Sequence, residues 1–239
     1  MDLKEADILG GGAGSHWYYR SKLAAVRALT SRLRYLTILD IGSGSGFFSR
    51  ALLAAGPATR AICLDPSYTV DRDECVNGKL LRFRREVTAS DADLLLFMDV
   101  LEHVDDDLGL LRQYTDAAPV GSHVLISVPA FMFLWSGHDV FLGHRRRYTL
   151  AQLTKLVERA QLRVVHSCYF FGFVFPIVVA TRLLEQSRRS SGGGPKSQLR
   201  SHHPVVNRVL TGVCRAEMPL FRLNRVAGLT AFCLARKEH

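Results

Sequence analysis

A glycine-rich segment follows an acidic residue near the start of the chain. The segment is Gly42-Ser-Gly-Ser-Gly46, between an apolar run over residues 36–41 and a predicted helix over residues 47–55. Glycine lets the backbone turn tightly and lets a ligand approach closely, and the N–H groups at the helix start face that ligand. Asp40 ends the first predicted strand and Asp65 the next, where a carboxylate can accept hydrogen bonds from both hydroxyls of a ribose. The pattern predicts a nucleoside-containing cofactor at this edge of a sheet.

Two other nucleotide-binding loops have a different spacing. A dinucleotide fold also offers a ribose carboxylate, but its Gly-x-Gly-x-x-Gly fingerprint needs a third glycine where this chain has Phe47. A P-loop continues as Gly-Lys-Ser/Thr, and no such sequence follows Gly46. A glycine turn that binds nothing is the remaining alternative.

Histidines and arginines follow the fourth and fifth predicted strands, at the edge where open α/β sheets bind ligands. His103, His138 and His144 are the candidate catalytic bases, because an imidazole can take up a proton near neutral pH. The loop after the fifth strand adds side chains that suit an acidic or hydroxylated acceptor: Trp135, Asp139, Arg145 and Arg146. Alternatives stay open, since His103 can be a cap or a cofactor contact and the two arginines can pair with the aspartates at 105–107.

The same region bears on metal binding. Glu102 and His103 precede three aspartates at 105–107, a mixture that can hold a metal ion. Aspartates at a helix start more commonly interact with the positive end of the helix, so we expect no metal site.

Apolar runs alternate with helical patterns over most of the chain. The predicted strands cover residues 36–41, 60–64, 79–83, 92–98, 124–128 and 229–234, with one more starting at 162. The predicted helices cover residues 16–33, 47–55, 105–118, 149–160 and 204–220. This alternation predicts an α/β fold with a parallel sheet and helices on both faces. We expect a single domain with an N-terminal helical cap (1–35), a cofactor-binding core (36–167), a helical insertion or lid (168–224) and a last strand and tail (225–239).

The composition is that of an ordinary folded protein. The 239-residue chain is 48% hydrophobic and 22% charged, which argues against a disordered chain, a collagen or a coiled coil. No apolar stretch is long enough to span a membrane and no signal peptide is visible, so we expect a cytoplasmic protein. Five cysteines without a C-x-x-C pair predict neither a disulfide framework nor a zinc knuckle.

The net charge of +9 is concentrated towards the C-terminus. Residues 188–239 hold 10 Lys and Arg against 2 Asp and Glu, a net of +8. Apolar residues are interleaved at helix-like spacing, so an anionic membrane surface or an acidic substrate suits the segment about as well as nucleic acid. We favour no nucleic-acid partner, and a peripheral membrane contact stays open.

Several segments resemble motifs of class I S-adenosyl-L-methionine-dependent methyltransferases. Leu39-Asp-Ile-Gly-Ser-Gly-Ser-Gly46 resembles their first motif, Cys63-Leu-Asp-Pro-Ser67 their second, and Phe97-Met-Asp-Val-Leu-Glu-His-Val104 the fourth-strand motif of the ubiquinone-biosynthesis type. The segments at 16–20, 134–149 and 227–237 resemble a bacterial small-molecule branch of that type. The resemblance covers nearly the whole chain. It implies a Rossmann-like, seven-stranded, mostly parallel sheet whose last strand is antiparallel and inserted beside the fifth.

The resemblance also implies roles for matching residues. Asp40 would hold the amino group of the methionine part of S-adenosyl-L-methionine, and Asp65 the ribose hydroxyls. The remaining cofactor contacts would be Tyr18, Gly42, Ser43, Gly44, Pro66, Ser67, Met98, Asp99 and Val100, with Glu86 near the adenine. The implied reaction is methyl transfer to a small molecule, most often at oxygen. The alternative is a cofactor-binding scaffold without transferase activity, which acts through its basic C-terminal segment on a partner or a membrane.

The connection before the last strand is longer than the basic fold needs. It spans residues 168–224, begins with an aromatic run and contains a Ser/Gly-rich linker over 187–203. A connection this long is usually functional or disordered. We expect a lid over the acceptor pocket, walled partly by Phe170, Phe171, Phe173 and Phe175. The alternative is a helical layer that completes the core, or a dimer contact.

Overall fold

The computed structural model describes residues 14–87, 90–187 and 204–239. Apart from Ser187, the predicted linker lies outside the described residues. Within them, one sheet has the strand order β3-β4-β2-β1-β5-β6-β8-β7. The strands are β1 (Thr37–Ile41), β2 (Arg60–Leu64), β3 (Arg72–Val76), β4 (Lys79–Arg84), β5 (Leu94–Met98), β6 (His123–Pro129), β7 (Leu162–Phe170) and β8 (Thr230–Lys237). The helices are α2 (Trp17–Thr30), α3 (Phe47–Ala55), α4 (Asp107–Thr115), α5 (Gly137–Leu142), α6 (Leu150–Arg159), α7 (Phe175–Ser187) and α8 (Pro204–Phe221), with short 3-10 helices η2 (Leu101–His103) and η3 (Met132–Leu134).

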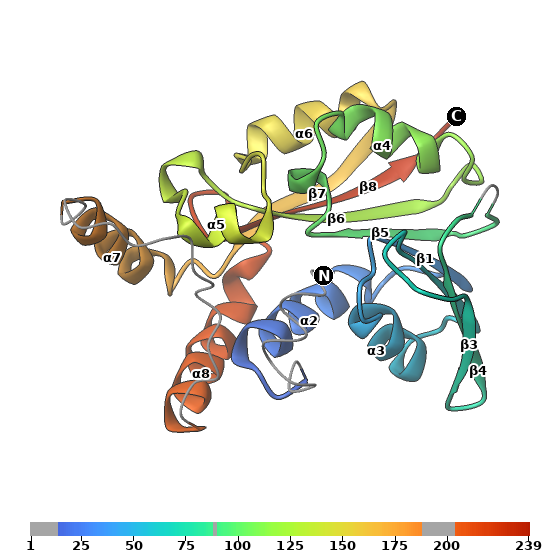
Figure 1. Ribbon diagram of the computed structural model, residues 1–239, viewed down its shortest axis with the longest axis horizontal. Coiled ribbons are helices and arrows are strands. Elements are labelled where there is room, and N and C mark those ends of the chain that lie inside the picture. Colours follow the sequence, from blue (N-terminus) through green and yellow to red (C-terminus); the bar gives the residue numbers. More distant parts are fainter. Residues whose placement is uncertain (1–13, 88–89, 188–203) are drawn as a thin grey trace.

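Helices cover both faces of the sheet (Figure 1). α4 and α6 lie on one face, and α2, α3 and α8 lie on the other. All five side chains of β5 are buried, and they alternate between the two cores. Leu94, Leu96 and Met98 belong to the core that contains α2, α3 and α8, whereas Leu95 and Phe97 belong to the core that contains α4 and α6. A strand covered on both faces needs such a continuous apolar sequence, and the predicted layering is confirmed.

The sheet has eight strands within the described residues, not the predicted seven. The additional strand, β3, pairs antiparallel with β4 at the edge of the sheet. Asn77 and Gly78 join the two strands with φ of 52° and 78°, the left-handed conformations of a two-residue hairpin turn. β3 reads Arg-Asp-Glu-Cys-Val and is largely exposed. Its sequence therefore lacks the apolar run on which the other strands were predicted.

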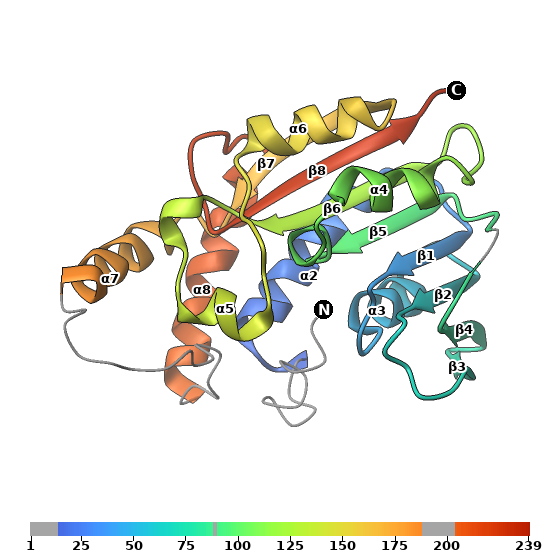
Figure 2. The same ribbon diagram turned by 45° about the horizontal axis from the view of Figure 1, so that its top comes forward.

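β8 lies between β6 and β7 and is antiparallel to both, as can be followed in Figure 2. The prediction of an antiparallel last strand beside the fifth predicted strand is confirmed, since that strand is β6. β7 continues to Phe170, so the predicted insertion starts inside a strand. The apolar run at 168–180 divides between the end of β7, a turn at Phe171 and the start of α7.

The two helices before β8 have different surroundings. α8 packs against α2, and Asn207 joins them. Its Oδ1 accepts a hydrogen bond from Trp17 N at 2.7 Å, and its Nδ2 donates one to Ser15 O at 2.8 Å. α7 projects away from the sheet (Figure 1) and exposes Ile177 and Leu184. Among the described helices, none has the length and apolar character needed to cross a membrane.

Candidate active site

The glycine loop joins β1 to α3. Gly42, Gly44 and Gly46 have φ of 63°, 55° and 71°, a region that residues with side chains rarely adopt. A Cβ atom at Gly42 would lie 2.7 Å from Cγ2 of Val100, so the loop backbone lies directly against the segment after β5. The loop is therefore a bare backbone surface at the start of a helix, as the predicted cofactor site requires.

A cleft of about 920 Å³ opens beside this loop. The predicted cofactor residues that line it are Gly42, Asp65, Pro66, Ser67, Asp99 and Val100, and Glu86 lies there too. Oδ2 of Asp65 accepts a hydrogen bond from Gly44 N at 3.0 Å, and Oδ1 accepts one from Ser67 N at 3.0 Å. These bonds fix a half-buried carboxylate at the end of β2. Its position in the cleft wall fits the predicted contact with ribose hydroxyls.

Asp40 in β1, Ser43 in the glycine loop and Met98 in β5 are buried. The lining of the cleft includes none of these three, nor Gly44. Oδ2 of Asp40 accepts a hydrogen bond from Ser49 Oγ at 2.7 Å, and Oδ1 has no hydrogen-bond partner among the described residues. Burial raises the pKa of Asp40 to about 6, against the effect of the Ser49 hydroxyl. Ser43 Oγ lies 2.7 Å from Tyr68 OH, and Met98 is buried in the core. Asp40 thus keeps one oxygen for a donor, whereas Ser43 and Met98 hold the loop and the strand in place.

A second cleft, of about 310 Å³, adjoins the first, and the two share Asp99 and His103. Its walls come from the start of α2, the segment after β5, the loop after β6, α7 and the start of β8. All three predicted bases, His103, His138 and His144, line it. Tyr18 also lines this cleft and not the first, so it lies on the side away from the other predicted cofactor contacts.

A buried ion pair supports the boundary between the clefts. Lys22 of α2 is completely buried, and its ammonium group pairs with the carboxylate of Asp99. Burial opposes the charge of Lys22, but the carboxylate outweighs burial and raises the pKa of Lys22. In the same way, Lys22 outweighs burial and lowers the pKa of Asp99. The pair therefore remains charged near neutral pH.

Strained backbone gathers along this edge of the sheet. Asp99, Phe131 and Phe171 follow the ends of β5, β6 and β7, and their φ values are 57°, 59° and 64°. Non-glycine residues in this conformation cost about 1–3 kcal/mol each and cluster at functional sites. Of the three, Asp99 lines both clefts.

Asp139 organises the loop after β6 from inside. Its buried carboxylate accepts hydrogen bonds from Ser136 N at 2.8 Å, His144 Nδ1 at 2.9 Å and Arg147 Nε at 2.7 Å. Burial favours the neutral acid, but the bonds from His144 and Arg147 outweigh it and lower the pKa of Asp139. Because an ionised carboxylate only accepts, Nδ1 of His144 carries the hydrogen and Nε2 of the neutral ring carries the lone pair. Asp139 was predicted to contact the acceptor; in the structure it orients His144 and lines neither cleft.

Arg145 and Arg146, also predicted to contact the acceptor, line neither cleft. Arg145 Nη1 lies 2.6 Å from Asp105 Oδ1, and Arg146 Nη1 lies 3.2 Å from Asp107 Oδ2. This is the pairing with the aspartates at 105–107 that the sequence left open. The two guanidinium groups therefore hold the loop after β6 against the start of α4.

The predicted aromatic wall lies outside the clefts as well. Phe170, Phe171, Phe173, Phe175 and Trp135 line neither of them. Phe171 instead supports the wall from behind, because its ring stacks on Tyr18 with centroids 5.1 Å apart. Phe175 packs on Phe131 at 5.5 Å, and Phe173 is exposed. The reason is the extension of β7, which carries Phe170 into the core and turns the following residues away.

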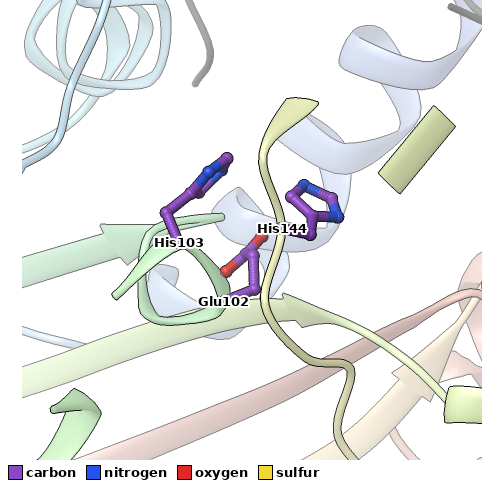
Figure 3. A group of neighbouring side chains, drawn as sticks. All are labelled: Glu102, His103 and His144. Carbon is purple, nitrogen blue, oxygen red and sulfur yellow. The ribbon is translucent and has the colours of Figure 1, made fainter. Parts of the chain in front are cut away.

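Glu102 is an unusual member of the site. It is completely buried on η2, and neither of its carboxylate oxygens has a hydrogen-bond partner among the described residues. Burial and the neighbouring Asp99 carboxylate raise its pKa well above the ordinary value. Its side chain lies next to the side chains of His103 and His144 (Figure 3), whose rings contact each other edge to face with centroids 4.7 Å apart.

Sequence reasoning missed several members of the site. Lys22 follows Tyr18 by four residues, a spacing that places both on one helix face. This spacing was the available signal that Lys22 would be buried. His16 and Arg182 line the second cleft from α2 and α7, and no local pattern distinguishes them. Arg147 was not among the predicted site residues, yet it lines the cleft and pairs with Asp139.

The fold and the two joined clefts define a Rossmann-like α/β protein with a glycine-loop cofactor site. Residues 16–167 match a family model described as a methyltransferase domain, and the chain belongs to that family. None of the curated proteins matches the chain. Family membership identifies the protein as a methyltransferase with S-adenosyl-L-methionine as its cofactor.

Solved structures share the fold at low sequence identity. One is from a complex of the Haloferax volcanii Trm112 methyltransferase activator with a protein described as a methyltransferase, at 17% identity and TM-score 0.58, covering 100% of this chain and 99% of that one. An S-adenosylmethionine-dependent methyltransferase of Mesorhizobium loti is 16% identical with a TM-score of 0.56, covering 91% and 98%. The phosphoethanolamine N-methyltransferase 2 of Haemonchus contortus, solved with S-adenosyl-L-methionine, is 14% identical with a TM-score of 0.54, covering 92% and 53%.

Proposed function

We propose that the chain transfers the methyl group of S-adenosyl-L-methionine to a hydroxyl of a small hydrophobic or acidic metabolite. The observation that carries the proposal is the junction of the two clefts at Asp99 and His103. The larger cleft has the glycine loop and the Asp65 carboxylate, which suit the cofactor. The smaller cleft has the volume of a small-molecule site and holds the candidate bases. Its contents would therefore meet the cofactor at the shared residues.

The chain's own residues would divide the remaining work. The cofactor, when bound, supplies an activated methyl group. Asp65 would bind the ribose hydroxyls. Asp40 does not line the cleft, so it would hold the amino group of the methionine part through a water molecule. Trp17, Tyr18 and Leu134 wall the smaller cleft, so they would orient the acceptor and exclude water. His103, His138 or His144 would accept the proton of the acceptor hydroxyl.

Binding of the cofactor is the first test. We expect isothermal titration to give one site for S-adenosyl-L-homocysteine. Gly44→Val should abolish binding, because a branched side chain would fill the loop and strain its φ of 55°. Asp65→Ala should weaken it by about 10-fold or more through loss of charge-assisted hydrogen bonds. Unchanged affinity in both variants would show that the cofactor binds elsewhere.

Turnover is the second test. Purified protein would be incubated with methyl-labelled cofactor and a panel of hydroxylated, carboxylated and amine acceptors. A true base should cost on the order of 10²–10⁴ in turnover when replaced by glutamine, with cofactor affinity unchanged. If His103, His138 and His144 can each be replaced with near-normal turnover, catalysis needs no base among them.

The second candidate is a cofactor-binding scaffold without transferase activity that binds a partner or a membrane surface. The exposed apolar side chains of η3 and α7 favour it: Met132, Phe133, Ile177, Leu183 and Leu184. Cofactor binding without turnover on any acceptor, together with flotation on anionic liposomes, would support this candidate over the first. Turnover without flotation would exclude it.

A further inference from the structure

Three potential metal ligands meet in the smaller cleft. Glu102 and His103 come from η2, and His144 comes from the loop between α5 and α6. One ligand atom of each lies within 4.8 Å of the others, and Figure 3 shows the three side chains grouped together. All three line the cleft. Two imidazoles and one carboxylate are the ligand set of many catalytic zinc and non-haem iron sites.

Glu102 lacks the partners that a buried carboxylate normally has. Both of its oxygens are without a hydrogen bond among the described residues, although a buried unpaired carboxylate is costly. Lys22 pairs with Asp99 and Arg147 pairs with Asp139, so neither of these two cations forms an ion pair with Glu102. A bound cation is the group that would use its two free oxygens.

His144 is held as metal-binding histidines are held. Its Nδ1 donates to Asp139 at 2.9 Å, and Asp139 is fixed in turn by Ser136 and Arg147. A carboxylate behind a histidine sets the tautomer and strengthens the other nitrogen as a ligand.

We propose that Glu102, His103 and His144 bind one divalent transition-metal ion of the zinc type, with an open coordination position toward the acceptor. Ligand atoms around such an ion lie about 3.3 Å apart, so small side-chain rotations would close the cluster. Magnesium and calcium prefer all-oxygen sites and do not suit two imidazoles.

The inference deepens the proposed function and rests on it for its role in catalysis. A metal-bound acceptor hydroxyl gives up its proton more readily. Its oxygen then forms a bond to the methyl carbon as the carbon–sulfur bond breaks, and S-adenosyl-L-homocysteine leaves with both electrons of that bond. His103 and His144 would then be ligands, and His138 would take the proton.

The test is zinc binding by the full-length protein, stripped with a chelator and titrated against a chromophoric zinc indicator. Cys75 is the exposed cysteine among the described residues, so the background is Cys75→Ser. We expect one tightly bound zinc ion. Excess magnesium should not displace it.

Matched variants separate the site from the fold. Glu102→Gln and His144→Asn should each weaken zinc at least about 100-fold, whereas His123→Asn, at the other end of β6, should leave it unchanged. Affinity for S-adenosyl-L-homocysteine should stay constant in all three, which shows that the fold is intact. Absence of stoichiometric zinc, or equal zinc affinity in Glu102→Gln and the parent, would overturn the metal site. Zinc binding without cofactor binding would instead overturn the proposed function and leave the metal site standing.

Discussion

Replacing Lys22 with methionine should lower the free energy of unfolding much more than any exposed substitution on the same helix. The side chain of Lys22 is 0% exposed and that of Asp99 is 23% exposed. Methionine keeps most of the volume and apolar stem but removes the ammonium group, so Asp99 is left charged, mostly buried and unpaired. Removal of one partner from a buried pair costs about 3–5 kcal/mol.

The partial exposure of Asp99 reduces this cost, because water can reach part of its carboxylate. We therefore expect a loss of about 2–4 kcal/mol, which for a chain of this length lowers Tm by about 5–15 °C. The measurement is urea denaturation at pH 7 without cofactor. Arg20→Met is the matched control, because Arg20 is exposed on the same helix and should change stability by less than about 0.5 kcal/mol.

The double variant isolates the interaction. Asp99→Asn is nearly isosteric, and asparagine tolerates the positive φ at this position. Lys22→Met with Asp99→Asn removes both charges and should return stability to within about 1 kcal/mol of the parent, since a buried pair is often no better than neutral groups. Additive losses in the double variant, or a Lys22→Met loss as small as that of Arg20→Met, would refute the reasoning.

Four further substitutions test the pKa of Asp40, two glycines and the support of His144. The pKa of Asp40 is about 6 in the folded chain, against an ordinary value of 3.8. The folded state therefore binds this proton more tightly than the unfolded state, and the contribution of Asp40 to stability falls as the pH rises between these two values. Asp40→Asn should therefore gain about 1–3 kcal/mol on the parent between pH 4 and pH 7 in urea titrations, and parallel curves would contradict this. Gly78→Ala should cost about 1 kcal/mol of stability, because a φ of 78° is unfavourable for a residue with a side chain. Gly212→Ala within α8 should stabilise the protein by about 0.5–1 kcal/mol. Neither new Cβ meets an atom within 4 Å, so a change of the same sign in both variants would contradict the prediction. Asp139→Asn should weaken zinc about 10–100-fold without changing its stoichiometry, which the same indicator titration measures.

The layers of the fold were predictable because its central strands are buried on both faces. β1 and β5 are buried along their whole length. β5 is apolar throughout and β1 is largely so, and such runs stand out in the sequence. β3 was missed because an exposed edge strand needs no apolar pattern. The Asn77-Gly78 pair was its one usable signal, since this dipeptide is typical of hairpin turns.

The cofactor side of the site was easier to predict than the acceptor side. The glycine loop and Asp65 lie on consecutive elements, so local spacing carried the information. The walls of the smaller cleft come from five separate segments, and no local pattern brings Tyr18, His144 and Arg182 together. Arg145 and Arg146 were wrongly placed in the cleft because they follow His144 directly in the sequence. In the structure they pair with Asp105 and Asp107 at the start of α4.

The position of β8 has a consequence for synthesis of the chain on the ribosome. β6 and β7 are made before β8, but they are not neighbours in the sheet, and β8 fills the space between them. Until residues 230–237 have been made, both strands present unpaired edges that are buried in the finished fold. The unpaired edges of β6 and β7 must therefore stay apart in the nascent chain while α7 and α8 are synthesised. A chain that ends before Leu229 would therefore be prone to aggregation. Its smaller cleft would also lack the wall that Leu229 and Thr230 provide.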